Sequence, residues 1–460
     1  MNQCQRHQQL SSNSGTIHRR TMLGGLAAGA LLGCGRRSGS VVNPRWPSNE
    51  IGVDSAMRQA SMSASGDRLG MPGPYPGRVI EVQHPGSVTD GQRNRTAVKL
   101  MIQRGMQQLV PESETAVDAW RSFFQLGDRV GIKVVPVGMV AKPGADTSVL
   151  GPVVDLRRPG PISSYEVVTE VVESLVTAGV RRNDILVFER FRIGFIRAGY
   201  TAMLPEGVHW ECSSATGYDA AQLELDGQIR GQRRQRNVSG YDRDVYRELA
   251  FCQDESIHDP HDDRRFRSHL SKIVTQKVDK IISIPVLKDH RSAGVTLALK
   301  NMSHGLVNNV CRSHPGALPG SEQAFTTSLN HCHTFIPAMV SLPQTREKCV
   351  LQILDGLVGN YEGGPGNWND TFATWDYKSL FFATDPVALD HVGWEIIDAK
   401  RAQEGWPAVA RMGRDAVEGL GTDQSEDFHI RQPQHIPLAS LLGLGVFDRQ
   451  KIDHQRVTLV

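Results

Sequence analysis

The fold of this chain is decided by Arg129-Val-Gly-Ile-Lys-Val-Val135 and by the segment after it, Ser164-Tyr-Glu-Val-Val-Thr-Glu-Val-Val-Glu-Ser-Leu-Val-Thr-Ala178. The first run is short and strongly β-branched, which predicts a buried strand. The second run has apolar residues at the spacing of one helix face. Asp184-Ile-Leu-Val-Phe-Glu189 then predicts another strand. This order of strand, helix and strand is typical of an α/β fold with a mostly parallel sheet.

The same alternation continues on both sides of these segments. Further strands are predicted over 78–83, 208–212, 280–285, 350–354 and 380–383, and further helices over 96–109, 113–124 and 386–401. We therefore expect an α/β domain over residues 78–446, with helices on both faces of the sheet. Residues 219–267 are polar and rich in arginine without a clear period, so we expect an insertion there. Residues 447–460 are expected to form a C-terminal tail.

The first 33 residues predict an export signal that is no part of the fold. Arg19 and Arg20 precede a mild apolar run over 22–32, as in a twin-arginine (Tat) signal. That run is too short for a membrane-spanning helix, which needs about 20 residues. Leu31-Leu-Gly-Cys34 resembles a bacterial lipobox, in which Cys34 would carry a lipid. An ordinary secretory signal with a chance arginine pair is the alternative.

These features predict where the protein works. We expect the twin-arginine export machinery as a partner and a location in the periplasm or cell envelope, anchored to the membrane if Cys34 is lipidated. Residues 34–77 are rich in serine, glycine, methionine and proline, and are expected to be a flexible tether. Because this route exports folded proteins, it favours a metal or cofactor without being evidence of one.

Composition narrows the functional classes. A formal net charge of +2 argues against a nucleic-acid partner. The chain has seven cysteines, of which Cys4 lies in the signal and Cys34 in the lipobox. None of the other cysteines stands in a Cys-x-x-Cys pair, which argues against an iron–sulfur cluster or a four-cysteine zinc site. A divalent metal held by other residues is left open.

Polar residues gather where the predicted strands end, the edge at which open α/β sheets bind ligands. Lys133 interrupts an apolar strand, so it is expected to face a partner or a ligand, or else to extend its charge past the strand end. Lys288 follows another buried strand. Thr296 and Lys300 share one face if this segment is helical, and Asn301 lies beside them. Together these residues predict a site for a carboxylate or a phosphate of a small ligand.

Acidic residues and a histidine near the same strand ends could supply chemistry. Asp289 and His290 are suited to metal ligation or to acid–base catalysis, with His290 as the expected general acid or base. Asp355, Glu362 and Asp390 are the expected ligands of a divalent metal, or groups that move protons.

Two further features each have an alternative explanation. Gly363 and Gly364 belong to a loop that could bring backbone N–H groups to an anion, but a plain glycine turn fits equally well. His331 and His333 would share a face if extended, with His304 near in sequence, yet two ligands do not make a metal site.

Several of these segments, in this order, resemble one family, the domain of unknown function 362. The segments that carry the resemblance are Val130-Gly-Ile-Lys133, Tyr165–Gly179, Ile284-Pro-Val-Leu-Lys288-Asp289-His290, Thr296-Leu-Ala-Leu-Lys300-Asn301, Asp355-Gly356, Glu362-Gly-Gly-Pro-Gly366 and Ala383-Thr384-Asp385-Pro386-Val-Ala-Leu-Asp390. The resemblance implies an α/β fold and brings no established reaction. Many relatives carry ferredoxin-type cysteine motifs, which this chain lacks. It also departs from the family after Asn301, where a stretch containing histidine and cysteine runs to His333.

Two functions remain open from the sequence. The first is an exported enzyme that uses a metal for hydrolysis or group transfer on a small anionic molecule. The alternative is a non-catalytic envelope module that binds a metal or an anionic ligand with the same lysines.

Overall fold

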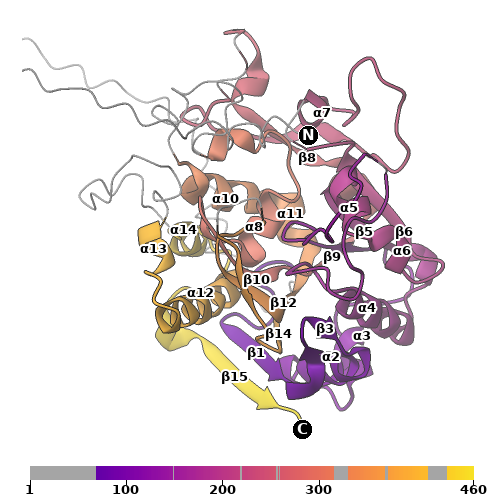
Figure 1. Cartoon of the computed structure of the whole chain (residues 1–460), viewed down its shortest axis with the longest axis vertical. Coiled ribbons are helices and arrows are strands. Elements are labelled where there is room, and N and C mark those ends of the chain that lie inside the picture. Colours follow the sequence, from indigo (N-terminus) through magenta and orange to yellow (C-terminus); the bar gives the residue numbers. More distant parts are fainter. Residues whose placement is uncertain are drawn as a thin grey trace, which may run out of the picture.

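The computed structural model describes residues 69–148, 150–217, 220–254, 257, 259–314, 330–367, 371–412 and 433–460 (Figure 1). The predicted export signal, with Arg19, Arg20 and Cys34, lies outside the described residues, as does most of the predicted tether. None of the helices in the described part of the chain combines the length and the hydropathy that crossing a bilayer requires.

A large mixed sheet forms the centre of the molecule. Its strands lie in the order β15 (Asp453–Thr458), β1 (Arg78–Gln83), β14 (Ser379–Ala383), β12 (Cys349–Glu362), β9 (Lys280–Ser283), β4 (Val130–Lys133), β5 (Ile185–Phe191) and β6 (His209–Ser214). Along this path β14 runs antiparallel to both of its neighbours, and all other neighbours pair in parallel. The predicted α/β fold with a mostly parallel sheet is therefore confirmed.

Helices cover both faces of this sheet. One face carries α2 (Arg95–Leu109), α3 (Ala116–Arg121) and α4 (Tyr165–Ala178); the other carries α8 (Leu297–Ser303), α10 (Cys332–Val340), α12 (Pro386–Gln403) and α14 (His435–Leu441). Side chains alternate along each strand, so Ile80 and Val82 of β1 join the first core and Val79 joins the second. Burial on both faces explains why the strands are apolar runs without polar alternation.

The long strand β12 carries smaller strands beyond the main path. On one side its first part pairs with β9, and its second part pairs with β10 (Val286–His290). β11 (Gly294–Val295) pairs antiparallel with β10, and β13 (Ala373–Trp375) pairs antiparallel with the end of β12. This extension places the Lys288–His290 segment beside the loop that follows β12.

The remaining elements are short or lie outside the large sheet. In the predicted insertion, β7 (Tyr241–Glu248) pairs with β8 (Arg267–Ser271) as a separate two-stranded sheet. The other elements are β2 (Val88–Thr89), β3 (Gln92–Arg93), α5 (Arg192–Arg197), α6 (Tyr200–Met203), α7 (Ala220–Leu223), α11 (Pro343–Lys348) and α13 (Val409–Met412), with short 3-10 or π turns between them.

Two predicted boundaries differ from the structure. Residues expected to be a C-terminal tail include β15, which pairs with β1 along its whole length because polar side chains, not an apolar run, hold it there. The end of the expected tether is also packed. Met71 is buried and its N–H donates to Arg346 O at 2.8 Å, and the Tyr75 ring contacts Phe123. These apolar side chains anchor the residues from 69 onward to the domain.

Candidate functional site

Two of the predicted polar residues, Lys133 and Asn301, meet at the carboxyl ends of β4 and β9. The chain leaves β4 through α4 toward β5 and β6, and then returns to place β9 on the other side of β4. Ligands of open α/β sheets bind where the strand order reverses in this way. Lys133 ends β4, Ser283 ends β9, and α8 lies across both ends.

The buried ammonium of Lys133 has hydrogen-bond acceptors and a carboxylate partner within the protein. Its Nζ donates to Val134 O at 2.7 Å and to Asn301 Oδ1 at 3.0 Å, and lies 3.7 Å from a carboxylate oxygen of Glu189. Asn301 in turn donates to Ser283 Oγ at 2.9 Å. Burial lowers the Lys133 pKa, and the Glu189 charge opposes that shift. Lys133 and Asn301 therefore tie β4, β9 and α8 together.

Lys288 is also buried, and its ammonium joins two loops at the sheet edge. Its Nζ donates to Val137 O, after β4, and lies 3.5 Å from Pro365 O, after β12. Burial lowers its pKa to about 7. The carbonyl partners indicate a role in positioning these loops.

Lys300 differs from the other two lysines. Its side chain lies on α8 and is 5 % exposed, and its Nζ lies 3.1 Å from His314 Nε2. Among the described residues, no carboxylate forms an ion pair with it. Burial lowers its pKa to about 8. Lys300 is thus a buried cation whose charge no acid compensates in the described part of the chain.

Several imidazoles lie near Lys300 and its partner His314. The rings of His290 and His304 lie 5.4 and 4.8 Å from the ring of His314, measured between centroids. Burial lowers the pKa of His290, His304, His314 and His435, and the Lys300 charge lowers each of them further. These rings are therefore neutral at pH 7. Neither His314 nor His435 could be predicted from the sequence, because neither belongs to a motif with recognisable spacing.

The hydrogen bonds of His290 argue against its predicted role as a general acid or base. Its Nδ1 accepts from the backbone N–H groups of Ser292 at 3.0 Å and Ala293 at 3.2 Å. A neutral ring with an accepting Nδ1 carries its proton on Nε2. His290 can therefore donate a hydrogen bond to a ligand, but it has no free lone pair with which to take a proton.

Asp289, the predicted catalytic partner of His290, faces the other way. Successive residues of β10 point to opposite sides, so Lys288 and His290 share one side and Asp289 lies on the other. Asp289 Oδ1 accepts from Gly364 N–H at 2.8 Å, and Oδ2 lies 3.5 Å from the Arg401 guanidinium. Burial raises its pKa to about 7, and the nearby Glu362 charge adds to the shift. The structure does not bring the predicted pair into one site.

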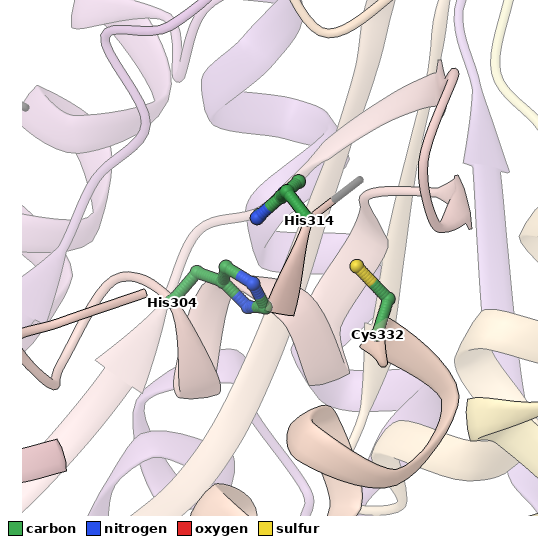
Figure 2. Close-up of side chains that lie close together, drawn as sticks. All are labelled: His304, His314 and Cys332. Atoms are coloured by element: carbon green, nitrogen blue, oxygen red, sulfur yellow. The ribbon is translucent and has the colours of Figure 1, made fainter. Parts of the chain in front are cut away.

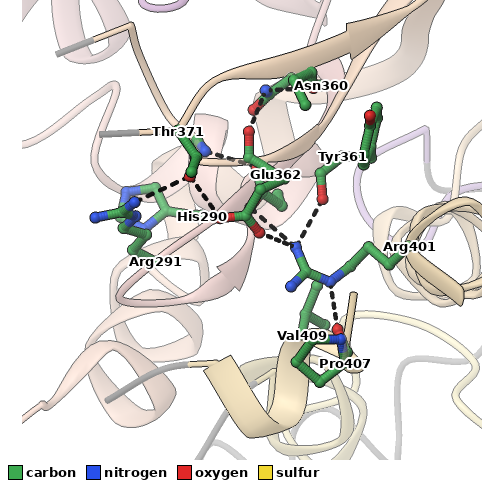
Figure 3. Close-up of polar contacts among 12 residues, drawn as sticks. His290, Arg291, Asn360, Tyr361, Glu362, Thr371, Arg401, Pro407 and Val409 are labelled. Carbon is green, nitrogen blue, oxygen red and sulfur yellow. Dashed lines mark hydrogen bonds and ion pairs between the residues drawn. The ribbon is translucent and has the colours of Figure 1, made fainter. Parts of the chain in front are cut away.

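Glu362 belongs to a buried network centred on Arg401 (Figure 3). Arg401 Nη1 donates to Glu362 Oε2 and to Tyr361 O, both at 2.7 Å. The other oxygen of Glu362 accepts from Thr371 Oγ1 at 2.7 Å, and Arg291 donates to the same threonine at 3.1 Å. Both carboxylate oxygens of Glu362 are therefore engaged within the protein.

The other two predicted metal ligands hold backbone groups. Asp355 accepts from Ser164 N–H at 2.7 Å and Leu357 N–H at 3.0 Å, and Asp390 accepts from the first N–H groups of α8. Burial raises the pKa of both carboxyls. With Glu362 held by Arg401, the three acids do not form one ligand group among the described residues.

The predicted glycine loop closes around Asp289. Gly364 N–H points to that carboxylate, and Gly363 has φ near +77°, with a Cβ placed there only 1.7 Å from Thr371 O. The N–H of Thr296 donates to the carbonyl oxygen of Lys288, in β10, at 3.0 Å. These groups position β10, and none of these contacts is directed at a ligand.

A different group has the chemistry of metal ligands. Ligand atoms of His304, His314 and Cys332 (Figure 2) lie within 4.8 Å of one another. Lys300 Nζ lies 3.1 Å from His314 Nε2, beside this group. His331 and His333 do not share a face, because α10 begins at Cys332 and helical residues two apart point in different directions.

Comparison with known proteins gives a single finding on the family. A family model described as "Domain of unknown function (DUF362)" matches residues 157–395, more than half of the chain. The match contains Lys288, Lys300 and Cys332 but not Lys133. No curated protein matches the chain.

Proposed function

The chain belongs to the domain of unknown function 362 family, and from its site we propose that it binds a small anion, a carboxylate or a phosphate, at Lys300. The family carries no assigned function, so the proposal rests on the site. One observation carries it: Lys300 is a buried ammonium with an imidazole as its hydrogen-bond partner and no ion-paired carboxylate among the described residues.

Physical chemistry favours an anion at this position. An ammonium taken out of water without an opposite charge is costly, and a bound anion would remove that cost. Neutral rings near Lys300 can donate further hydrogen bonds to the anion. In His290, for example, Nδ1 accepts from two backbone N–H groups, and these contacts leave the Nε2–H available as a donor. A cation with hydrogen-bond donors beside it is the environment that binds a carboxylate or phosphate oxygen.

The test compares two lysine variants by calorimetric titration with inorganic phosphate, acetate and succinate. Lys300→Met should lower the affinity for the bound anion by about tenfold or more, since a charge-assisted hydrogen bond contributes ~1.5–3 kcal/mol. It should leave the melting temperature unchanged or higher, because it removes an unmatched buried charge. Lys280→Met is the control, because Lys280 pairs with Asp128 at 2.8 Å. Equal binding by wild type and Lys300→Met, or no binding of any of these anions, would contradict the proposal.

A second candidate, metal-assisted hydrolysis or group transfer on the same anion, is favoured by the His304–His314–Cys332 group beside Lys300. Neither His290 nor Asp289 is placed as a free base, so the metal would have to activate the nucleophile. The two candidates separate in Cys332→Ser: a binding module keeps its anion affinity and has no turnover to lose. An enzyme loses turnover of small phosphate or carboxylate esters.

We also propose that the protein acts in the cell envelope, delivered by the twin-arginine route and anchored through Cys34. The support is the Arg19-Arg20 pair and the lipobox-like Leu31-Leu-Gly-Cys34. Replacing both arginines of the pair by lysine should retain the protein in the cytoplasm, whereas the same change at Arg36 and Arg37 should not. Cys34→Ser should release the exported protein from the membrane fraction. Normal export of the first variant would contradict the route.

A further inference from the structure

We propose that His304, His314 and Cys332 form a zinc site with three protein ligands and an open fourth position beside Lys300. This inference goes beyond anion binding, which does not depend on it. The three residues were not expected as a set from the sequence, and none of the acids predicted as metal ligands belongs to it.

The three side chains come from separate segments that the fold brings together (Figure 2). His304 follows the end of α8, His314 follows the 3-10 turn Cys311–Ser313, and Cys332 is the first residue of α10. One ligand atom from each lies within 4.8 Å of the others. His304 and Cys332 are buried, so the group is held by the packing of α8 against α10.

Hydrogen bonds to the outer ring nitrogens prepare both histidines for coordination. His314 Nδ1 lies 3.2 Å from Val310 O, so this nitrogen carries the proton and Nε2 presents its lone pair. His304 has a serine hydroxyl near each nitrogen, Ser303 at 3.0 Å and Ser313 at 2.8 Å. Whichever nitrogen binds a metal, the other keeps a partner. Such contacts orient the rings of metal-bound histidines and raise their basicity.

The donor set favours zinc or copper, because two imidazoles and one thiolate occur in sites for both metals. Two neutral imidazoles and one thiolate suit Zn²⁺, and a site with three protein ligands keeps a position for water or substrate. On binding, the thiol proton leaves to solvent and the thiolate sulfur forms the bond to the metal. A sequence of Cys-x-x-Cys type is not needed for such a site.

Lys300 competes with the metal for His314, and its charge also favours an anion at the open fourth position. Its ammonium lies 3.1 Å from His314 Nε2, and Arg190 adds a second positive charge nearby. Zinc therefore has to displace Lys300 from His314. The freed ammonium then lies next to the open position, where an anion could contact both cations; this last step rests on the proposed anion binding.

The experiment uses the full mature chain, stripped with chelator and titrated with Zn²⁺ and with Co²⁺. We expect about one equivalent of zinc by elemental mass spectrometry, and a thiolate-to-cobalt charge-transfer band in the Co²⁺ form. Cys332→Ser and His314→Gln should each weaken zinc binding by about tenfold or more. Cys349→Ala is the matched control, because Cys349 is a buried cysteine on β12 whose sulfur accepts from Gln352 at 2.8 Å.

Lys300→Met separates this inference from the proposed function. It should keep or tighten zinc binding, because it removes a competing cation, while it weakens anion binding by about tenfold or more. Zinc binding that persists in both ligand variants, or a Co²⁺ form of the wild type without a thiolate band, would overturn the zinc site even if a variant failed to fold. Anion binding through Lys300 without zinc would leave the proposed function standing alone, and zinc without anion binding would refute that function instead.

Discussion

Arg401 is the residue on which two buried acids depend. Its side chain is 0 % exposed, its Nη1 lies 2.7 Å from Glu362 and 3.5 Å from Asp289, and its Nε donates to Pro407 O at 2.6 Å. The same guanidinium also holds Tyr361 O, so it joins α12 to the end of β12. Removing one partner from a buried ion pair leaves an uncompensated charge.

Arg401→Met should therefore lower the free energy of unfolding by about 3–5 kcal/mol, because Glu362 and Asp289 lose their cation in a buried site. Urea unfolding measures the change. Arg449→Met is the control: Arg449 pairs with Glu395 at 3.1 Å, but both side chains are more than 40 % exposed. Its loss should cost at most about 1 kcal/mol. Equal effects of the two variants would show that the Arg401 network adds no stability.

The charged residues of the site could be predicted from the sequence, but their ion-pair and hydrogen-bond partners could not. Glu362 lies 39 positions before Arg401, and no local pattern links them. Nothing in the sequence distinguishes Lys133 from Lys300, yet Lys133 pairs with the carboxylate of Glu189 and Lys300 contacts the imidazole of His314. The edge of the sheet was predicted as the place of the site because polar residues follow the predicted strands. The pairing of charges depends on contacts between elements far apart in the chain.

At the scale of elements, α8 is held by an acid from another helix. Asp390 of α12 accepts from Ala298 N–H at 2.7 Å and Leu299 N–H at 2.9 Å, the first turn of α8. Helix-start N–H groups have no partner within their own helix, and a carboxylate satisfies them. α8 carries Lys300, so this cap positions the candidate site.

Asp390→Ala should lower the free energy of unfolding by about 1–3 kcal/mol, because two buried N–H groups lose their acceptor. Zinc content should stay the same, because the carboxylate faces backbone and not a metal. Asp448→Ala, at an exposed turn that it caps in the same way, should cost less. Loss of bound metal in Asp390→Ala without loss of stability would restore the role predicted for it from the sequence.

A second element, β15, pairs with β1 along the backbone and is further held there by one buried carboxylate. Glu81 of β1 accepts from Tyr377 Oη at 2.8 Å and Ser379 Oγ at 3.0 Å, and contacts His454 and Arg456 of β15 at 2.9 and 2.8 Å. Burial alone would raise the Glu81 pKa, but the hydrogen bonds and the Arg456 charge outweigh it and lower that pKa.

The lowered pKa fixes the direction of a pH effect. An acid whose folded pKa lies below its unfolded value stabilises the protein above the unfolded value and loses that contribution as the pH falls. Glu81→Gln should therefore destabilise the protein most at neutral pH, and the difference from wild type should shrink below pH ~4.5. Chemical unfolding across this range measures it. A difference that grows on acidification would mean that Glu81 is protonated in the fold.

Elements were predictable where apolar residues form them. β1, β4, β5, β9 and β14 follow the predicted runs closely, because their side chains are buried on both faces. β15 was missed because Asp453-His-Gln-Arg-Val-Thr458 has one apolar residue and is held by polar contacts. His331 and His333 would share a face only in an extended chain, but His333 lies in α10 and His331 directly precedes that helix.

At the scale of the whole molecule, β15 closes one edge of the sheet. β1 is apolar, with Val79, Ile80 and Val82 fully buried, and β15 covers its outer hydrogen-bonding groups (Figure 1). An uncovered apolar edge strand is a template for pairing with another chain.

Deletion of residues 453–460 should therefore cause self-association rather than a simple loss of stability. We expect a lower soluble yield and oligomers by size-exclusion chromatography with light scattering. Lys451→Ala, just before the strand and three-quarters exposed, serves as the control. A monomeric, soluble truncated protein would show that β15 is dispensable for covering this edge.

The position of β1 between β14 and β15 also sets the order in which the sheet can be completed during synthesis. Glu81 contacts Tyr377 and His454, which lie 296 and 373 positions later in the chain. Chains emerge from the ribosome N-terminus first. The first strand of the sheet therefore waits, unpaired, until almost the whole described chain has been made. The arginine pair at residues 19 and 20 emerges before any of this, so on the proposed route transport must be delayed until the last strand has docked beside the first.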